Sequence, residues 1–127
     1  MSFEIEKKDK YTLIRSKVEK LDTTVSPLLK SELVVISNDG GRNIIIDLSH
    51  TRYCDSSGLS AILVGNRLCK NANGSFIVCG LQDSVKKLIT ISQLDTILNI
   101  TPSFTEAEDM LFMEEVERDI LNGDNEE

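Results

Sequence analysis

Two short apolar runs constrain the fold of this 127-residue chain more than any other feature. The runs "NIIIDLS" (43–49) and "SFIVCGL" (75–81) are continuous rather than alternating in hydropathy, which is typical of strands covered on both faces. Between them, the apolar residues of 59–72 recur at the spacing of one helix face. A strand, a helix and a second strand in this order predict a parallel pair of strands joined by a right-handed crossover.

The N-terminal part of the chain predicts a hairpin followed by a helix. Segments 3–8 and 11–18 are alternating or apolar and are separated by a short polar turn, which indicates two antiparallel strands. Ser26 and Pro27 suit the start of a helix, and "NDGG" at 38–41 ends it. This helix therefore leads directly into the first buried strand.

The C-terminal part continues the alternation of helices and strands. A short helix is expected from Asp83 or Ser84, and a short strand over 96–102. Thr105 and Glu108 form a capping-box pattern at the start of a last helix. The whole order predicts a single α/β domain. We expect a mostly parallel central sheet of about four to five strands with an N-terminal hairpin, and helices packed against the sheet.

The acidic residues are concentrated at the C-terminal end. The formal net charge is −7, but residues 106–127 hold ten acidic residues and one basic residue, which leaves residues 1–105 with a net charge of +2. Because binding along nucleic acid requires a basic patch, we expect no direct nucleic-acid partner. The last six residues, "NGDNEE", are expected to be disordered and solvated. The alternative is that this acidic end binds a partner.

Sequence signatures of catalysis are absent. The chain has no GxxxxGK[ST] phosphate loop, no GxGxxG fingerprint and no GxSxG elbow. His50 is the only histidine. The His, Cys and carboxylate residues of the chain lack the spacing of metal ligands. From these absent signatures we expect no cofactor, no metal and no enzymatic activity.

The cellular compartment follows from the cysteines and from hydropathy. Cys54, Cys69 and Cys79 are odd in number and widely spaced, which predicts reduced, buried thiols in a cytoplasmic protein. No segment approaches the ~20 apolar residues that span a bilayer, and the N-terminus has no signal-peptide pattern. We therefore expect no membrane insertion.

The stretch "CDSSGLSAIL" (54–63) lies at a predicted junction of strand and helix. Asp55 or Ser56 can cap the unpaired N–H groups of the first helical turn, and Gly58 can ease a tight turn, so helix initiation alone is one explanation of the stretch. The same position exposes a serine hydroxyl at the carboxyl end of a strand, where open α/β sheets place their sites. A phosphate there would meet the positive end of a helix dipole and the negative charge of Asp55, and would switch an interface.

Several motifs follow one another in a recognisable order. They are an apolar strand ending in Asp47-Leu48, Asp55-Ser56-Ser57-Gly58-Leu59 opening a helix, a turn at Gly74, the strand Phe76 to Cys79, and Val85 with Leu88 in the next helix. This order resembles the STAS domain of the bacterial anti-sigma-factor antagonists, over about residues 3–112. The resemblance implies a STAS domain over residues 1–112 and an acidic helix end with a disordered tail over 113–127. One departure is Glu19-Lys20, where related proteins usually have Gly-Glu, so the partner is expected to differ from the well-known ones.

The resemblance implies a phosphorylation substrate rather than an enzyme. In that family, an anti-sigma factor with a kinase fold uses ATP to phosphorylate the first serine of the pair, which is Ser56 here. The unmodified protein binds this serine kinase and frees a sigma factor, and the phosphorylated form binds poorly until a serine phosphatase removes the group. The alternative is a non-catalytic STAS subunit of another assembly, such as a lipid-transport ATPase or a stress-signalling complex. A hydrolase with Ser56 as nucleophile would need a base, for which His50 is the only histidine.

The partner-binding surface implied by the resemblance comprises Asp22, Asp55, Ser56, Ser57 and Gly58. Asp22, in "KLDTT", matches the family's acidic position after the second strand, or it is a turn or cap residue. Asp55 either orients the Ser56 hydroxyl or caps the helix. Ser57 is a first-turn residue or a second phosphate acceptor. Gly58 allows either close approach of a partner or the geometry of a helix start.

Overall fold

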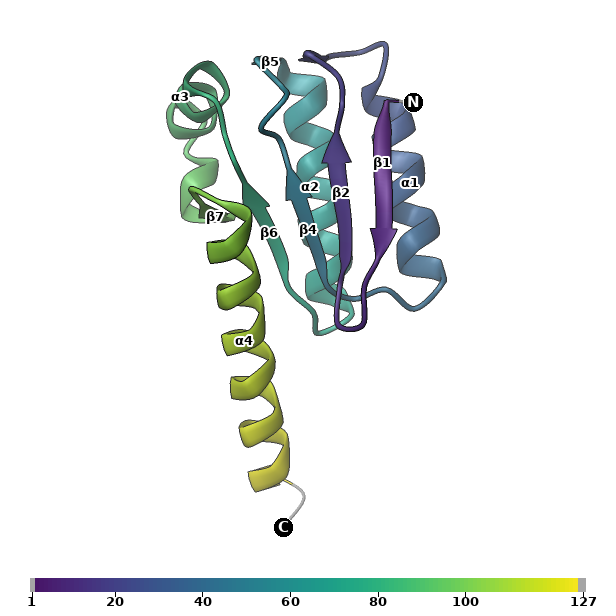
Figure 1. Ribbon diagram of the computed structural model, residues 1–127, viewed down its shortest axis with the longest axis vertical. Coiled ribbons are helices and arrows are strands. Elements are labelled where there is room, and N and C mark those ends of the chain that lie inside the picture. Colours follow the sequence, from purple (N-terminus) through teal and green to yellow (C-terminus); the bar gives the residue numbers. More distant parts are fainter. Residues whose placement is uncertain (1, 126–127) are drawn as a thin grey trace.

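A five-stranded sheet forms the centre of the molecule (Figure 1). The computed structural model describes residues 2–125. The strands lie in the order β1-β2-β4-β6-β7 and are β1 (Phe3–Lys7), β2 (Thr12–Ser16), β4 (Ile44–Asp47), β6 (Phe76–Cys79) and β7 (Asn99–Thr101). Strand β1 is antiparallel to β2, and the other neighbouring pairs are parallel. The predicted α/β domain with a mostly parallel sheet and an N-terminal hairpin is confirmed.

Helices cover both faces of the sheet. Residues of α1 (Ser26–Asn38), α2 (Ser56–Asn71) and α3 (Asp83–Ile91) pack in one core, and α4 (Phe104–Asn125) crosses the opposite face (Figure 1). A short 3₁₀ helix, Leu94–Thr96, precedes β7. Because the two cores lie on opposite sides of the sheet, the central strands are shielded from water on both faces.

The two continuous apolar runs form the central strands β4 and β6, as predicted. Ile44 and Ile46 belong to the core that includes α1 and α2, whereas Ile45 belongs to the core that includes α4. All three side chains are fully buried. Successive residues of a strand point to opposite faces, so a strand between two helical layers must be apolar at every position.

Two helices begin at residues other than those predicted. Helix α2 begins at Ser56, before the predicted start at residue 59. Helix α4 begins at Phe104, and Ser103 accepts from the Glu106 N–H at 3.3 Å while donating to the Glu106 carboxylate at 3.2 Å. The capping pair is therefore Ser103–Glu106 rather than the predicted Thr105–Glu108. The Glu108 carboxylate instead accepts a hydrogen bond of 2.6 Å from the Tyr11 hydroxyl of the hairpin.

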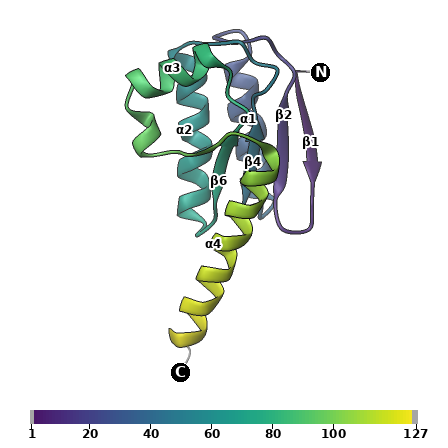
Figure 2. The same ribbon diagram turned by 60° about the vertical axis from the view of Figure 1, so that its left-hand side comes forward.

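The acidic end of the chain also differs from the prediction. We expected disorder from Asn122, but α4 continues to Asn125, and Glu126 and Glu127 lie outside the described residues. The helix is anchored at Glu115, which accepts from the Arg118 guanidinium at 2.8 Å and from the Asn43 amide at 2.6 Å. The bond to Asn43 ties α4 to the segment that precedes β4, whereas the bond to Arg118 lies within the helix. Beyond this contact α4 projects past the end of the sheet (Figure 2). The division of the chain at residue 112 stays a prediction.

Between residues 2 and 125, no helix combines the length and the apolar character that crossing a membrane requires.

Candidate functional site

A small parallel ladder positions the candidate site. Strands β3 (Lys20–Leu21) and β5 (Tyr53–Cys54) pair in parallel, separately from the main sheet. The Asp55 N–H continues this pairing by donating to the Leu21 carbonyl at 3.3 Å. Asp22 and Asp55, which follow the two strands, are thereby brought together at the end of the molecule where α2 begins (Figure 1). Sequence reasoning missed this ladder, because strands of two residues have no detectable period.

Asp55 caps helix α2. Its Oδ1 atom accepts from the Ser57 N–H at 2.9 Å, from the Gly58 N–H at 3.1 Å and from the Ser57 hydroxyl at 2.5 Å. The Ser57 hydroxyl and the Gly58 N–H hold the pKa of this carboxyl below its ordinary value, so it is ionised at neutral pH. Of the two roles considered for Asp55, the structure shows the helix cap. Its side-chain hydrogen bonds go to Ser57 and Gly58 rather than to Ser56.

The two serines of the motif have different surroundings. Ser56 is the first residue of α2 and is exposed, and no hydrogen bond to its hydroxyl is found within residues 2–125. Ser57 is half-buried; its hydroxyl donates to Asp55 and lies 3.0 Å from the Ser26 hydroxyl. Ser26 in turn donates to the Asp22 carbonyl at 2.6 Å. The Ser56 hydroxyl is therefore available to a partner, whereas that of Ser57 is held in an internal network.

Asp22 is a partly exposed turn residue beside Asp55. Its Oδ1 accepts from the Thr24 N–H at 3.0 Å and from the Thr24 hydroxyl at 2.6 Å. These two bonds lower the pKa of Asp22, and the charge of Asp55 opposes the lowering. The two carboxylates therefore interact, and both carry negative charge at neutral pH. Asp55 directly precedes the exposed Ser56, so negative charge lies next to this serine.

Gly58 allows α2 to approach the ladder closely. A Cβ atom at this position would lie 2.5 Å from the Leu21 carbonyl oxygen and 2.6 Å from the Cys54 sulfur. Both distances are too short for real contacts. Gly58 is itself buried, and the structure shows the close packing at the helix start, which is one of the two roles considered for it. A role in the approach of a partner stays a prediction.

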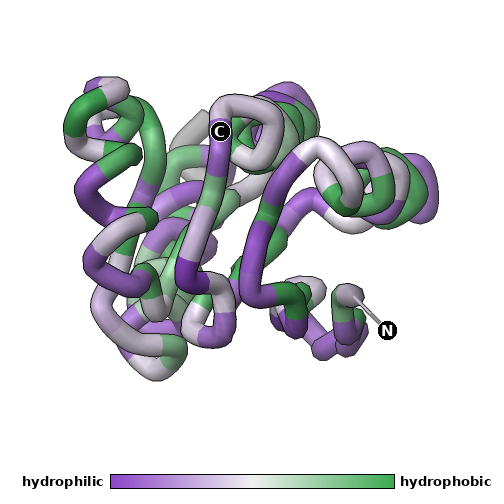
Figure 3. Tube along the Cα trace, turned by 90° about the horizontal axis from the view of Figure 1, so that it is seen from above, coloured by the Kyte–Doolittle hydropathy of each residue, from purple (hydrophilic) through white to green (hydrophobic). Residues whose placement is uncertain are grey.

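The loop after β4 is fixed beside the site. Asp47 Oδ1 accepts from the Ser49 N–H at 2.9 Å, and the Gln82 amide donates to the Ser49 carbonyl at 2.6 Å. Gly80, with a φ of +72°, allows the turn between β6 and α3. Figure 3 looks onto this end of the molecule, where hydrophilic and hydrophobic stretches of the chain alternate.

The described residues do not form a nucleophilic centre around Ser56. The His50 ring is exposed, and its Nδ1 atom lies 3.5 Å from the hydroxyl of Ser49 rather than in contact with Ser56. Over residues 2–125, no group of three or more His, Cys, Asp or Glu side chains is arranged to hold a metal ion. Within the described part of the chain, the Ser56 hydroxyl lies at the start of a helix and no base is hydrogen-bonded to it.

The three cysteines are free and buried, as the sequence predicted. Burial raises the pKa of Cys54, Cys69 and Cys79 to about 12. Thiols with such pKa values are largely protonated at neutral pH and are poor nucleophiles. They contribute to the core rather than to chemistry at the site.

Comparison with protein families decides the identity of the fold. The STAS domain model matches residues 2–107. The chain belongs to the STAS domain family. The anti-sigma-B factor antagonist of Staphylococcus aureus is 30% identical over 81 residues, covering 63% of this chain and 74% of that protein. A putative anti-sigma factor antagonist of Bordetella bronchiseptica, BtrV, is 27% identical over 75 residues, which span 59% of this chain and 65% of that protein. Both relatives are named as antagonists of anti-sigma factors.

Solved structures share the fold. The anti-sigma factor antagonist SpoIIAA in its unphosphorylated form matches with a TM-score of 0.73 at 21% sequence identity, covering 85% of this STAS protein and 94% of that chain. The Bacillus SpoIIAA in its phosphorylated form matches with a TM-score of 0.67 at the same identity, covering 85% and 97%. At this level of identity the likeness establishes the arrangement of helices and strands, which is the one predicted.

Proposed function

We propose that this STAS protein is a cytoplasmic anti-sigma-factor antagonist switched by phosphorylation of Ser56. In its unmodified form it binds an anti-sigma-factor serine kinase, which then releases a sigma factor. The kinase phosphorylates Ser56 and the complex weakens. A serine phosphatase restores the binding form. Membership of the STAS family and the names of the curated relatives support this function.

The observation that carries the assignment is the difference between Ser56 and Ser57. An acceptor hydroxyl must reach into the active site of a kinase, and Ser56 is exposed without an internal hydrogen bond among the described residues. Ser57 would first have to break its bond of 2.5 Å to Asp55, and with it part of the cap of α2. The geometry therefore favours Ser56 over Ser57 as the acceptor.

The surroundings of Ser56 explain why a phosphate would weaken binding. A phosphoserine carries a charge of about −1.5 to −2 at neutral pH. A helix start normally attracts such a group through its free N–H donors, but Asp55 already accepts from the Ser57 and Gly58 N–H groups. The phosphate is thus left beside the negative charge of Asp55, which repels it. Its oxygens would also occupy the surface that the exposed Ser56 hydroxyl offers to a partner, so the two proteins would no longer fit closely there.

The chemistry is expected to reside in the kinase. The Ser56 oxygen forms a bond to the γ-phosphorus of ATP while the bond to the leaving ADP oxygen breaks, and the hydroxyl proton passes to a base. The described residues place no base on the Ser56 hydroxyl, so the kinase supplies the base, the nucleotide and its magnesium. The phosphatase later transfers the phosphoryl group to water. On this basis the protein is a substrate and a binding module, not an enzyme.

Matched serine variants test the switch. We expect Ser56→Ala to bind the host's anti-sigma kinase as the unmodified protein does and to resist phosphorylation, and Ser56→Asp to bind at least about tenfold more weakly. Ser60→Ala is the control, because Ser60 is an exposed serine on the same helix. Affinities are measured by titration calorimetry, and phosphorylation by transfer of label from ATP. Equal affinities of Ser56→Ala and Ser56→Asp would contradict the mechanism.

A further inference from the structure

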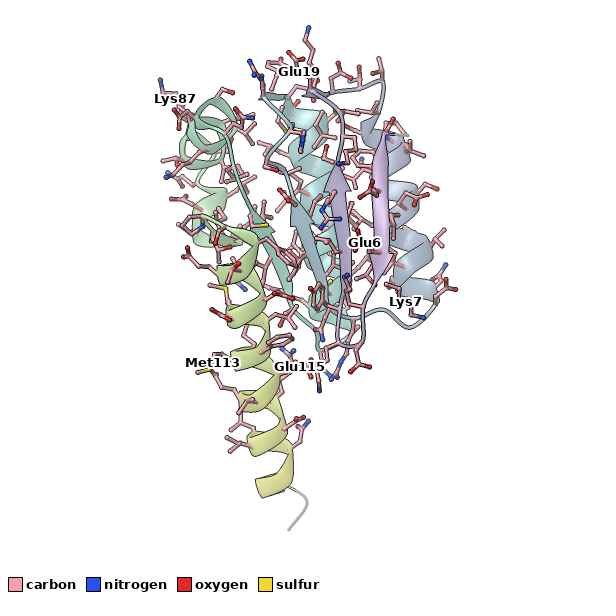
Figure 4. All side chains as sticks on the ribbon, in the orientation of Figure 1. Glu6, Lys7, Glu19, Lys87, Met113 and Glu115 are labelled. Carbon is pink, nitrogen blue, oxygen red and sulfur yellow. The ribbon has the colours of Figure 1, made fainter. Side chains whose placement is uncertain are left out.

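Helix α4 has a second apolar face that the fold does not cover. One face packs on the sheet through Ala107 and Leu111, which are fully buried. The other is formed by Phe112, Met113, Val116 and Ile120, which are 40, 62, 52 and 59% exposed. We call these four residues the α4 stripe. Positions 112, 116 and 120 recur every four residues and so line one side of the helix. Figure 4 shows Met113 pointing away from the strands and Glu115 toward them.

The end of α4 projects beyond the sheet (Figures 1 and 2). Among the described residues, Arg118 is the last residue of α4 that is hydrogen-bonded to the body of the molecule. It donates to the Ser75 hydroxyl at 3.0 Å and to the Asn43 side-chain oxygen at 3.4 Å. Ile120 lies beyond this anchor. Short helical segments without packing partners are marginal in water, so a partner that covers the α4 stripe would also stabilise the projecting end.

The charges that α4 itself places beside the α4 stripe are negative. Asp109, Glu117 and Asp119 are exposed beside it. The single basic residue of the helix, Arg118, is occupied with Glu115 at 2.8 Å. Two copies of α4 packed stripe to stripe would place these carboxylates against one another, which is unfavourable. A helix with lysine or arginine beside its apolar face would pair with them instead.

A cavity beside the α4 stripe can receive an apolar side chain. It has a volume of about 470 Å³ and lies between α4 and the β1–β2 hairpin. Phe112 and Val116 line it together with Leu13 and Phe104. Lys8 and Lys10 stand on its hairpin side, and Lys8 is already paired with Glu6 at 2.9 Å. A pocket of this kind can hold one apolar anchor side chain of a partner, and such anchors give an interface much of its binding energy and specificity.

We propose that the α4 stripe docks a basic amphipathic helix of a partner protein. The partner helix lies along α4, with apolar side chains on the four stripe residues and cationic side chains opposite Asp109, Glu117 and Asp119. The start of α2 lies at the top of Figure 1, whereas the part of α4 that carries the stripe lies in the lower half, on the other face of the sheet. Docking is therefore independent of the charge on Ser56, and this surface keeps a partner attached in both states of the switch.

A model peptide tests this surface on the full chain. The probe is a short fluorescent amphipathic peptide with leucine on one helical face and lysine on the other, followed by fluorescence anisotropy at physiological ionic strength. We expect the double variant Val116→Ser/Ile120→Ser to bind at least about tenfold more weakly than the unmodified protein. The matched control is Val35→Ser/Ile91→Ser, which alters a valine 54% exposed and an isoleucine 72% exposed on other helices. The control and Ser56→Asp should bind as the unmodified protein does.

A second variant separates docking from helix stability. Glu117→Gln/Asp119→Asn leaves the α4 stripe intact, and it should weaken binding and reduce the salt dependence of the affinity. Equal binding by the stripe variant and its control would overturn the proposal, as would equal binding of a peptide with glutamate in place of lysine. A dimer in sedimentation that dissociates in Val116→Ser/Ile120→Ser would also overturn it, since the occupant would then be a second copy.

Discussion

Replacing Gly58 by alanine tests how the candidate site is built. The added Cβ would lie 2.5 Å from the Leu21 carbonyl oxygen, 2.6 Å from the Cys54 sulfur and 3.0 Å from the Leu21 Cγ. The first of these atoms is backbone and belongs to the β3–β5 ladder, so α2 must move away from the ladder. The Asp55 N–H bond to the Leu21 carbonyl, already 3.3 Å long, is the contact most directly at risk.

The magnitude follows from two opposing effects. Overpacking a tight contact costs about 1–3 kcal/mol, whereas alanine is better than glycine inside a helix by about 1 kcal/mol. We therefore expect a net loss of up to about 2 kcal/mol in the free energy of unfolding, and a midpoint of thermal unfolding lower by up to roughly 8 °C. Circular dichroism measures the midpoint, and amide hydrogen exchange by NMR reports the Asp55 N–H, which should exchange faster.

Gly65→Ala is the matched control on the same helix. Its Cβ would lie 2.5 Å from the Phe76 ring, in the core and away from the ladder. This variant should lose stability as well, but the Asp55 amide should keep its protection relative to the global unfolding limit, and binding of the kinase should persist. If Gly58→Ala retained both its stability and the protection of Asp55, the close approach of α2 to the ladder would not be what positions the site.

Three further predictions concern the cap, the thiols and the anchor of α4. Asp55→Ala removes the cap of α2 and should lower the free energy of unfolding by about 1 kcal/mol in urea titrations; an unchanged midpoint would refute the cap. The three cysteine thiols, with pKa values raised to about 12 by burial, should resist a thiol reagent at mildly alkaline pH until guanidinium unfolds the chain, and rapid labelling of the folded protein would contradict their burial. Burial raises the pKa of Glu115, but the hydrogen bonds from Arg118 and Asn43 outweigh it and leave the pKa below its ordinary value of 4.5. Because the folded pKa is the lower one, Glu115 stabilises the fold above the unfolded pKa, and this stabilisation is lost as the pH falls through the folded pKa. Urea midpoints should therefore fall more steeply with acidification in the unmodified protein than in Glu115→Gln, and equal slopes would refute the anchor.

The central sheet could be predicted from the sequence because its strands obey a strong physical rule. A strand between two helical layers is apolar at every position, and β4 and β6 meet that condition through residues such as Ile45 and Ile77. Their parallel pairing then follows from the intervening helix. The start of α1 was also predictable, because Pro27 is favoured in a first helical turn and not later.

The parts that escaped prediction depend on contacts between distant residues. Ser103 and Thr105 both begin a capping-box pattern, and the choice between them depends on Tyr11, which takes the Glu108 carboxylate from 97 residues away. The helical acidic end depends in the same way on Glu115 meeting Asn43. Neither contact has a local signal in the chain.

The helix start at Asp55 and Ser56 could be predicted from the sequence, whereas the partner-binding role of these residues stays a prediction. The motif identified Asp55 and Ser56 but left open whether the aspartate caps the helix or orients the serine. The hydrogen bonds to Ser57 and Gly58 show the cap. For Gly58 the sequence left open the close approach of a partner or the geometry of a helix start. The structure shows close approach to the β3–β5 ladder, whose strands are too short to be predicted from the sequence.

The most direct test of the switch is the mass of the protein taken from its own cells in the presence of phosphatase inhibitors. Intact-mass measurement with fragment mapping should find a species heavier by one phosphoryl group, about 80 Da, with the added mass on Ser56. Its proportion should change between growth and stress. A phosphoryl group on Ser57 instead, or no modification under growth, starvation or stress, would contradict the assignment of Ser56 as the switch.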